Sequence, residues 1–178
     1  FVNKMDRENA DFDAAVAGTK ATFGGNVVQL QLPIGSQDSF SGIVDIVSMK
    51  AVLYKGGKGT EAEIPDDMKE TAELARMSMI EAAAEADDDV LAKYLEGEEL
   101  TEEEIFAGLV KGIAENRFVP VLCGSATKNI GIVELLNSIV KYAPAADKAI
   151  VSGTKAKSEE IVTRGSGDPF SSLVFKTT

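Results

Sequence analysis

The chain has 178 residues, of which 44% are hydrophobic and 26% are charged. This length corresponds to one domain or slightly more, and this composition excludes a wholly disordered chain. No apolar run approaches the ~18 residues that a membrane span requires, so we expect no membrane contact. The formal charge of -11, from 18 basic and 29 acidic residues, argues against DNA or any nucleic-acid groove that depends on bulk positive potential.

Two amino acids constrain the chemistry further. Cys123 is the one cysteine, so the chain forms no internal disulfide, and we expect an inert core thiol in a reducing, cytoplasmic compartment. Histidine is absent, which removes His-dependent triads and imidazole metal sites, and we predict no metal site within the chain. The chain begins at Phe1 without an initiator methionine and ends on a strand-like segment, residues 173–176, so we expect a piece of a longer protein.

The N-terminal third predicts a helix between strands. Residues 1–2 read as the end of a buried strand, and a polar loop leads into a helix over residues 11–23 that stops at a Gly-Gly pair. Residues 27–32 alternate apolar and polar side chains, and residues 42–54 are rich in Val and Ile before a glycine turn. We expect both segments to be antiparallel strands.

An acidic module follows. The window 59–104 contains 17 acidic and 3 basic residues, a net charge of -14, whereas the rest of the chain carries 12 acidic and 15 basic residues, a net of +3. Within residues 66–90, apolar residues recur every three or four positions, which is the spacing of one helical face. Three aspartates at 87–89 predict a helix boundary rather than a calcium loop. Thr101 and Glu104 form a capping box that predicts the start of a further helix.

The C-terminal part returns to a strand and helix pattern. Residues 118–123 are a continuous apolar run, typical of a parallel strand covered on both faces. An amphipathic helix follows over residues 131–142, and residues 144–167 lack periodicity, as a linker would. Because strand-loop-helix units flank the acidic module, the predicted fold class is α/β, a parallel sheet with helices that carries an inserted α+β subdomain with an antiparallel sheet.

The tetrapeptide Asn3-Lys4-Met5-Asp6 has the form NKxD and lies between a strand and a helix, where open α/β sheets bind ligands. Guanine presents an N1–H and an exocyclic N2 amino group side by side, and the Asp6 carboxylate could accept from both, whereas adenine would leave it unpaired. The Lys4 stem could lie across the base plane, and Asn3 could bridge the purine and an adjoining loop. Alternatively, Asp6 is a solvated carboxylate or a cap for the following helix.

A second loop follows the buried apolar strand. Cys123-Gly124-Ser125-Ala126 precedes a helix, and the small side chain at position 126 would let the Ala126 N–H approach the guanine O6. Ser125 would cap the last helix and so hold that N–H outward. Lys128 either stacks near the base or is solvated. The two loops together predict a guanine pocket.

These motifs resemble the elongation factor G family of translational GTPases. The resemblance extends in order and spacing over nearly the whole chain. It is carried by residues 1–7 (FVNKMDR), 10–12 (ADF), 31–35 (QLPIG), 93–101 (KYLEGEELT) and 119–126 (VPVLCGSA). The chain departs from the family pattern at Asn9, at Thr127 and at residues 144–146, which leaves an elongation-factor-G-like paralogue with a different ribosomal role as an alternative.

The resemblance implies that the chain is the C-terminal part of a P-loop-type GTPase domain, divided into five segments. Residues 1–25 would be a partial GTPase domain with the guanine-reading loop, and residues 26–117 the inserted subdomain. Residues 118–143 would complete the GTPase domain, residues 144–167 would be a linker, and residues 168–178 would start a following β-barrel domain.

The resemblance also implies a function for the parent protein: it would bind GTP or GDP with Mg²⁺, hydrolyse GTP on the ribosome and promote translocation. The chain contains no G-x-x-x-x-G-K-S/T phosphate loop, no switch segments and no ligands for that Mg²⁺, so we expect it to be inactive alone.

The resemblance implies, in addition, that the insertion contacts the C-terminal domain of the large-subunit stalk protein. The candidate contacts here are Glu70, Glu73, Glu81 and Glu85. A charge-rich helix face is also a common solubility feature. A further alternative is a non-catalytic acidic interaction module.

Overall fold

The computed structural model describes residues 1–23, 26–145, 151–154, 161–165 and 167–168. The chain divides into two units, Phe1–Ala143 and Pro144–Thr178, which we describe separately. None of the helices in the described ranges is long and apolar enough to cross a membrane.

A parallel sheet lies at the centre of the first unit. Strand β1 (Asn26–Gln29) pairs in parallel with β6 (Phe118–Val121), with Asn26 opposite Phe118. On the side of this segment away from β1, Val2 forms a parallel bridge to Cys123, two residues after β6 ends. The apolar run therefore lies between two parallel neighbours, as predicted, and the predicted α/β fold class is confirmed. The expected cover on both faces is incomplete in this structure, because Val119 is 50% exposed while Phe118 and Val121 are buried.

A four-stranded antiparallel sheet adjoins the parallel one. Its strands lie in the order β2 (Gln31–Ile34), β3 (Gly42–Asp45), β4 (Lys50–Lys55) and β5 (Lys58–Ala62). Successive strands along the chain are neighbours in the sheet, so short turns suffice to connect them.

The structure corrects the two predicted antiparallel strands. Residues 27–32 contain parts of two strands, because the chain changes sheets at Leu30, whose N–H donates to the Val121 carbonyl at 2.9 Å and whose carbonyl accepts from the Ile46 N–H at 3.0 Å. The antiparallel prediction is therefore wrong for β1. Residues 42–54 form two strands, because the Asp45 carboxylate accepts from two N–H groups of the following turn.

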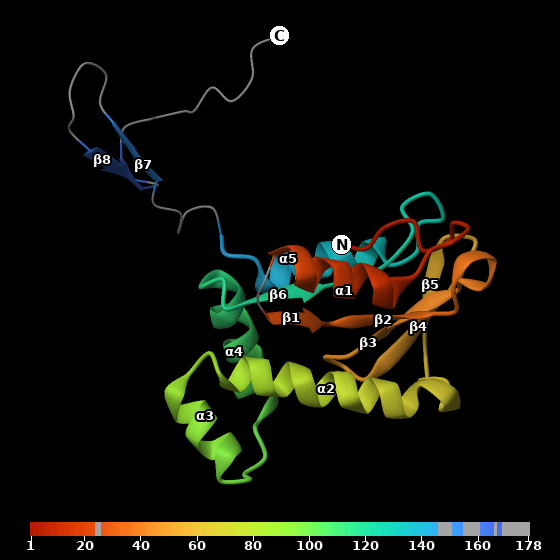
Figure 1. Ribbon diagram of the computed structural model, residues 1–178, viewed down its shortest axis with the longest axis horizontal. Helices are drawn as coiled ribbons and strands as arrows, with labels where there is room; N and C mark the ends of the chain where they lie inside the picture. Colours follow the sequence, from red (N-terminus) through yellow and green to blue (C-terminus); the bar gives the residue numbers. More distant parts are fainter. Residues whose placement is uncertain (24–25, 146–150, 155–160, 166, 169–178) are drawn as a thin grey trace. The chain divides into compact units, whose positions relative to one another are not determined.

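Five α-helices lie in the described part of the first unit, and Figure 1 shows α1 and α5 on one side of β1 and β6, with α2 on the other. The Gly-Gly pair predicted to end α1 lies outside the described residues. The helices are α1 (Phe12–Phe23), α2 (Lys69–Ala84), α3 (Asp88–Leu95), α4 (Glu102–Ala114) and α5 (Ile132–Tyr142), with 3-10 helices η1 (Gln37–Ser39) and η2 (Asp66–Met68).

The two helix starts predicted in the acidic module are confirmed. Asp87 is the N-cap of α3, where its side chain accepts from the Asp89 N–H at 3.2 Å. Thr101 is the N-cap of α4, and its hydroxyl accepts from the Glu104 N–H at 3.2 Å, while the Glu104 carboxylate accepts from the Thr101 N–H at 2.9 Å. These caps satisfy N–H groups that the helix itself leaves unpaired.

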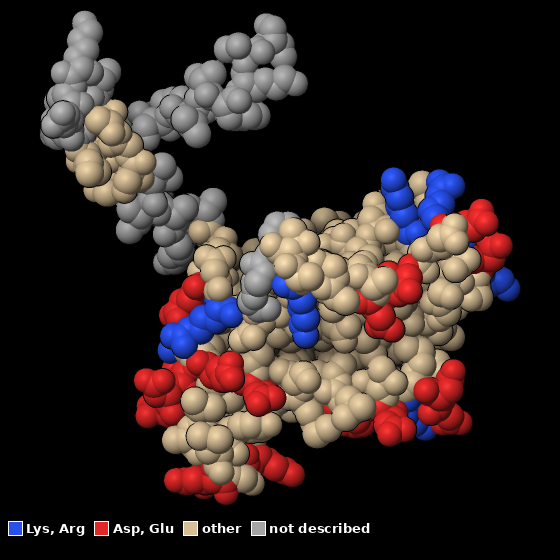
Figure 2. Space-filling model, in the orientation of Figure 1, with Lys and Arg blue, Asp and Glu red and all other residues tan. Residues whose placement is uncertain are grey.

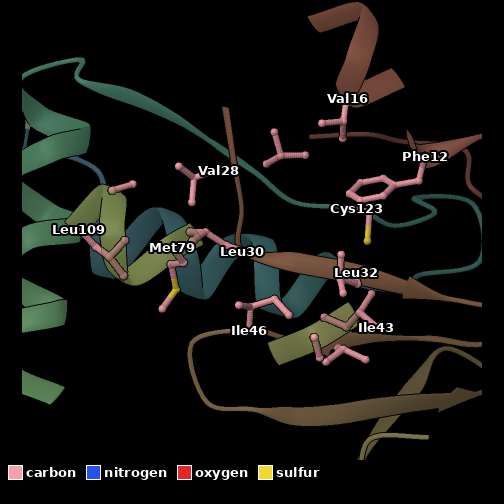
Figure 3. Packing of buried hydrophobic residues seen from close by; sticks show 14 of the residues in the cluster. Phe12, Val16, Val28, Leu30, Leu32, Ile43, Ile46, Met79, Leu109 and Cys123 are labelled. Carbon is pink, nitrogen blue, oxygen red and sulfur yellow. The ribbon is translucent and has the colours of Figure 1, made fainter. Parts of the chain in front are cut away.

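One hydrophobic core joins both sheets. Figure 3 shows Phe12 beside Cys123 at one end of this core and Met79 beside Leu109 at the other. Each such side chain contributes roughly 1.5–3 kcal/mol when it is removed from water. Burial also raises the pKa of the Cys123 thiol to about 12, which is the behaviour of an inert core residue.

The second unit contains β7 (Val151–Thr154) and β8 (Ile161–Arg164), which pair antiparallel. The sequence predicted a linker without regular structure over residues 144–167, and this ladder differs from that prediction. Residues 169–178 of the predicted β-barrel start lie outside the described residues.

Candidate guanine-binding site

The N-terminal loop leaves the parallel sheet after Val2 and takes a course set by backbone contacts. The Asn3 side-chain oxygen accepts from the Lys4 N–H at 2.8 Å, and Lys4 has a φ of 64°. Met5 is 1% exposed, and its N–H donates to the Gly124 carbonyl at 3.2 Å. Met5 points into the core, and of the polar residues beside it Lys4 is exposed and Asp6 is half-buried.

The second loop is closed on itself. Ser125 and Ile130 form an antiparallel bridge with two N–H to carbonyl hydrogen bonds of 2.9 Å. The buried Ser125 hydroxyl accepts from the Lys128 N–H at 3.2 Å and lies 3.2 Å from the Thr127 hydroxyl. The predicted capping of the last helix by Ser125 is wrong, because Gly131 is the N-cap of α5 and Ser125 caps the turn before it.

Asn3 joins the two loops. Its side-chain oxygen accepts from the Ala126 N–H at 3.0 Å, in addition to the bond from Lys4. Asn3 therefore contacts the adjoining loop directly, as its predicted bridging role requires. The Ala126 N–H, predicted to face the guanine O6, donates to Asn3 here.

Asp6 supplies the unsatisfied acceptor of the site. Its carboxylate is half-buried, and among the described residues its Oδ1 is buried without a hydrogen-bond partner. The neighbouring Ser125 hydroxyl is the main cause that holds the pKa of Asp6 below its ordinary value, and the positive charges of Lys128 and Arg7 act in the same direction. Asp6 is therefore ionised at neutral pH and can only accept hydrogen bonds.

This carboxylate fits the donors of guanine. A buried acceptor without a partner costs free energy, roughly 1–3 kcal/mol, until a donor arrives. The adjacent N1–H and N2 amino group of guanine are two donors that one carboxylate can accept together. The Lys4 and Lys128 side chains are exposed on these same two loops, where they add positive charge.

Two contacts near this site are not predicted by the sequence. Asn129 donates from its side-chain nitrogen to the Gly57 carbonyl at 3.1 Å, and Tyr54 hydrogen-bonds to the Glu134 carboxylate. The residues of each pair are 72 and 80 positions apart in the chain. The Gly-Gly pair before β5 predicts a tight hairpin turn, but it does not predict which residues the turn contacts.

The four candidate glutamates are exposed on and just after α2, and Glu85 is its C-cap. Within the described residues none of the four forms an ion pair. Leu74 and Met77 lie between them along the helix and are 56% and 54% exposed. Figure 2 shows further acidic side chains gathered over α3 and near both ends of α2. Glu70, Glu73, Glu81 and Glu85 thus border an exposed apolar strip.

Residues 1–145 match the family model of the elongation factor Tu GTP binding domain. The chain belongs to this family. It is 46% identical over 182 residues to elongation factor G of Thermotoga neapolitana, an alignment that covers 99% of this chain and 26% of that protein. This chain therefore spans about a quarter of the length of the relative.

A solved structure has a similar fold. A crystal structure of a protein from Thermus thermophilus matches with a TM-score of 0.75 and 30% sequence identity, over 83% of this chain and 22% of that one. The predicted resemblance to elongation factor G is confirmed by these two relatives and the family model.

Proposed function

We propose that this chain is the guanine-recognising and partner-binding part of a longer GTPase of the elongation factor G type. The observation that carries the proposal is the buried Oδ1 of Asp6, which has no partner among the described residues and belongs to a carboxylate that is ionised at neutral pH. An acceptor of this kind at the meeting point of two loops is suited to the paired donors of guanine.

Each loop residue has a distinct role in this proposal. Asp6 accepts from the N1–H and N2 amino group of the base, and the Ser125 hydroxyl beside it lowers the pKa of that carboxyl further. Asn3 holds the loops together. Ala126 leaves room for the ring through its small side chain and shares its N–H between Asn3 and the guanine O6. Lys4 covers the base plane.

The parent protein would use this pocket to bind GTP or GDP and would hydrolyse GTP on the ribosome during translocation in the cytoplasm. The 178 residues hold no phosphate-loop motif, so phosphate and Mg²⁺ binding would come from other parts of the longer protein. We therefore expect this chain alone to hydrolyse no GTP above background. The alternatives are a paralogue with another ribosomal role and a non-catalytic acidic module.

We also propose that the exposed face of α2 binds the C-terminal domain of the ribosomal stalk protein. Four exposed carboxylates without ion pairs in the described residues would attract a basic surface, and Leu74 and Met77 would supply apolar contact at its centre. A solvated face made only for solubility would have no need of these apolar side chains.

The experiment that tests the nucleotide assignment is the Asp6→Asn substitution in the longer protein. An amide can donate where the carboxylate accepts, so the variant should prefer xanthine over guanine nucleotides. Asp13→Asn, an exposed position in the first turn of α1, is the matched control for the loss of one charge. Equal use of GTP and XTP by the Asp6 variant and the unmodified protein would remove Asp6 from the site.

A further inference from the structure

The hairpin between β4 and β5 touches the second guanine loop. Asn129, the last residue before the Ser125–Ile130 bridge closes, donates from its side chain to the Gly57 carbonyl at the hairpin tip, at 3.1 Å. A Cβ atom placed on Gly57 would lie 3.5 Å from the Asn129 Cβ, which is ordinary van der Waals contact. Figure 1 shows the hairpin tip and the loop after β6 at the same end of the first unit.

A second contact fixes the same hairpin to the helix that follows the loop. The half-buried Tyr54 hydroxyl on β4 donates to the carboxylate of Glu134, in the first turn of α5. Burial, together with Glu134, raises the pKa of Tyr54, so the hydroxyl keeps its proton and remains a donor at physiological pH. The loop is thus held at Asn129 and again just after its end.

The two ends of the loop are tightly packed against each other. A Cβ atom on Gly124 would lie 2.4 Å from the Ile130 carbonyl, and one on Gly131 would lie 2.5 Å from the Cys123 carbonyl. The Asn129 N–H also donates to the Ala126 carbonyl at 3.3 Å. This hydrogen bond joins Asn129 directly to the Ala126 backbone, so we expect a shift of Asn129 to reach Ala126.

These contacts form a continuous path from the inserted sheet to the base-reading loops. The Gly57 carbonyl accepts from the Asn129 side chain, the Asn129 N–H donates to the Ala126 carbonyl, and the Ala126 N–H donates to Asn3. The bond from Asn129 to Gly57 joins the second loop to the hairpin, and the bond from Ala126 to Asn3 joins the second loop to the N-terminal loop. The bond from Asn129 to Ala126 lies within the second loop. The path ends one residue before Lys4 and three before Asp6.

From this path we infer that Asn129 and Tyr54 are positioning residues for guanine binding, through which the β4–β5 hairpin holds the second loop against the base. The inference rests on the proposed function. Neither residue touches the base in this account. Their contribution is to keep the loop in its binding geometry, and by linkage a bound nucleotide in turn stabilises the hairpin contact.

The test is the Asn129→Asp substitution in the longer protein. Asn129 has a φ of 55°, which aspartate tolerates, and the new carboxylate would repel the Gly57 carbonyl instead of donating to it. GDP affinity should fall roughly 3- to 10-fold, mainly through faster dissociation, as expected for one lost hydrogen bond. The preference for GDP over XDP should not change, because Asp6 is intact. Tyr54→Phe should give a smaller effect in the same direction.

The control is Asn116→Asp. Asn116 is exposed in the turn after α4 and has a φ of 56°, so the backbone geometry and the charge change match those of Asn129. Dissociation of GDP from Asn129→Asp and Tyr54→Phe at the rate of the Asn116→Asp control would overturn the inference. If Asn129→Asp fails to fold, Tyr54→Phe carries the same test alone.

Failure of this inference differs from failure of the proposed function. If Asp6→Asn leaves base preference unchanged, the guanine site itself is wrong. If Asp6→Asn shifts the preference and the Asn129 and Tyr54 variants release GDP normally, the site is right and only the hairpin's role is wrong. A general loss of stability would lower the fraction of binding-competent protein without changing the dissociation rate.

Discussion

The guanine loops and the exposed face of α2 use charge in opposite ways. The loops place a few polar atoms at fixed positions, with Ser125 fully buried and Asp6 Oδ1 buried beside it. The α2 face places its carboxylates in water, where no ion pair within the described residues holds them. Binding by the loops would therefore depend on the positions of single atoms, whereas binding by the α2 face would depend on its total charge.

This difference has energetic consequences. A buried hydrogen-bonding group loses its full contribution when it is displaced by an ångström, because water cannot replace the partner. Exposed charges act over roughly 10 Å at moderate salt, so the loss of one is partly compensated by its neighbours. Substitutions in the loops should therefore have effects that do not depend on salt, whereas the effects of substitutions on α2 should shrink as salt is added.

The largest effect is expected at Gly124. A Cβ atom there would lie 2.4 Å from the Ile130 carbonyl and 2.9 Å from the Phe1 ring, so Gly124→Ala must move backbone. We expect this substitution to destabilise the chain by about 1–3 kcal/mol, measured by urea unfolding. Gly18→Ala in α1 has no atom within 4 Å and should instead stabilise it slightly. Equal stability of Gly124→Ala and the unmodified chain would show that the loop is not tightly packed.

An intermediate effect is expected from Glu73→Lys combined with Glu81→Lys. Reversal of two exposed charges should weaken binding to the stalk C-terminal domain roughly tenfold at low salt, and the difference should shrink as salt is added. Glu102→Lys with Glu103→Lys in the first turn of α4 makes the same change in net charge on a different helix. If both pairs weaken binding equally, the effect is one of net charge and the α2 face is not the site.

The smallest effect concerns Glu104, a carboxylate of the acidic module that does have fixed partners. Lys93 at 2.6 Å and the capping contacts with Thr101 lower the pKa of Glu104 to about 2, from an ordinary value of 4.5. Because the folded-state pKa is the lower one, the stabilisation is present above pH 4.5 and is lost as the pH falls toward 2.

The Glu104→Gln variant tests this directly. Denaturant unfolding should show it less stable than the unmodified chain near neutral pH, with the difference vanishing as the pH approaches about 2. Glu103→Gln, at the neighbouring residue outside the capping box, is the control. A difference that is constant with pH would mean that the Glu104 charge is not responsible.

The sequence predicted what local chemistry determines. Helix starts at Asp87 and Thr101 follow from side chains that satisfy nearby N–H groups, and a run of apolar residues identified β6 as a parallel strand. The NKxD motif and its partner loop were found for the same reason, since each is a short segment between a strand and a helix.

What the sequence could not predict depends on long-range contacts. The change of sheet at Leu30 is invisible to alternation, because a half-buried strand has the same pattern in either sheet. The Asn3 contact to Ala126 and the Asn129 contact to Gly57 each join residues far apart in the chain, and no local pattern encodes them. The loop residues of the candidate site were therefore predictable from sequence, whereas the hairpin contacts and the bond lengths between the loops were not.

The most direct measurement is the ratio of GDP to XDP affinity for the longer protein and for its Asp6→Asn variant. We expect a strong preference for GDP in the unmodified protein and a reversed preference in the variant, because the acceptor at the Watson–Crick edge becomes a donor. The same ratio in both proteins would contradict this expectation and would leave Asp6 as a loop carboxylate without a ligand.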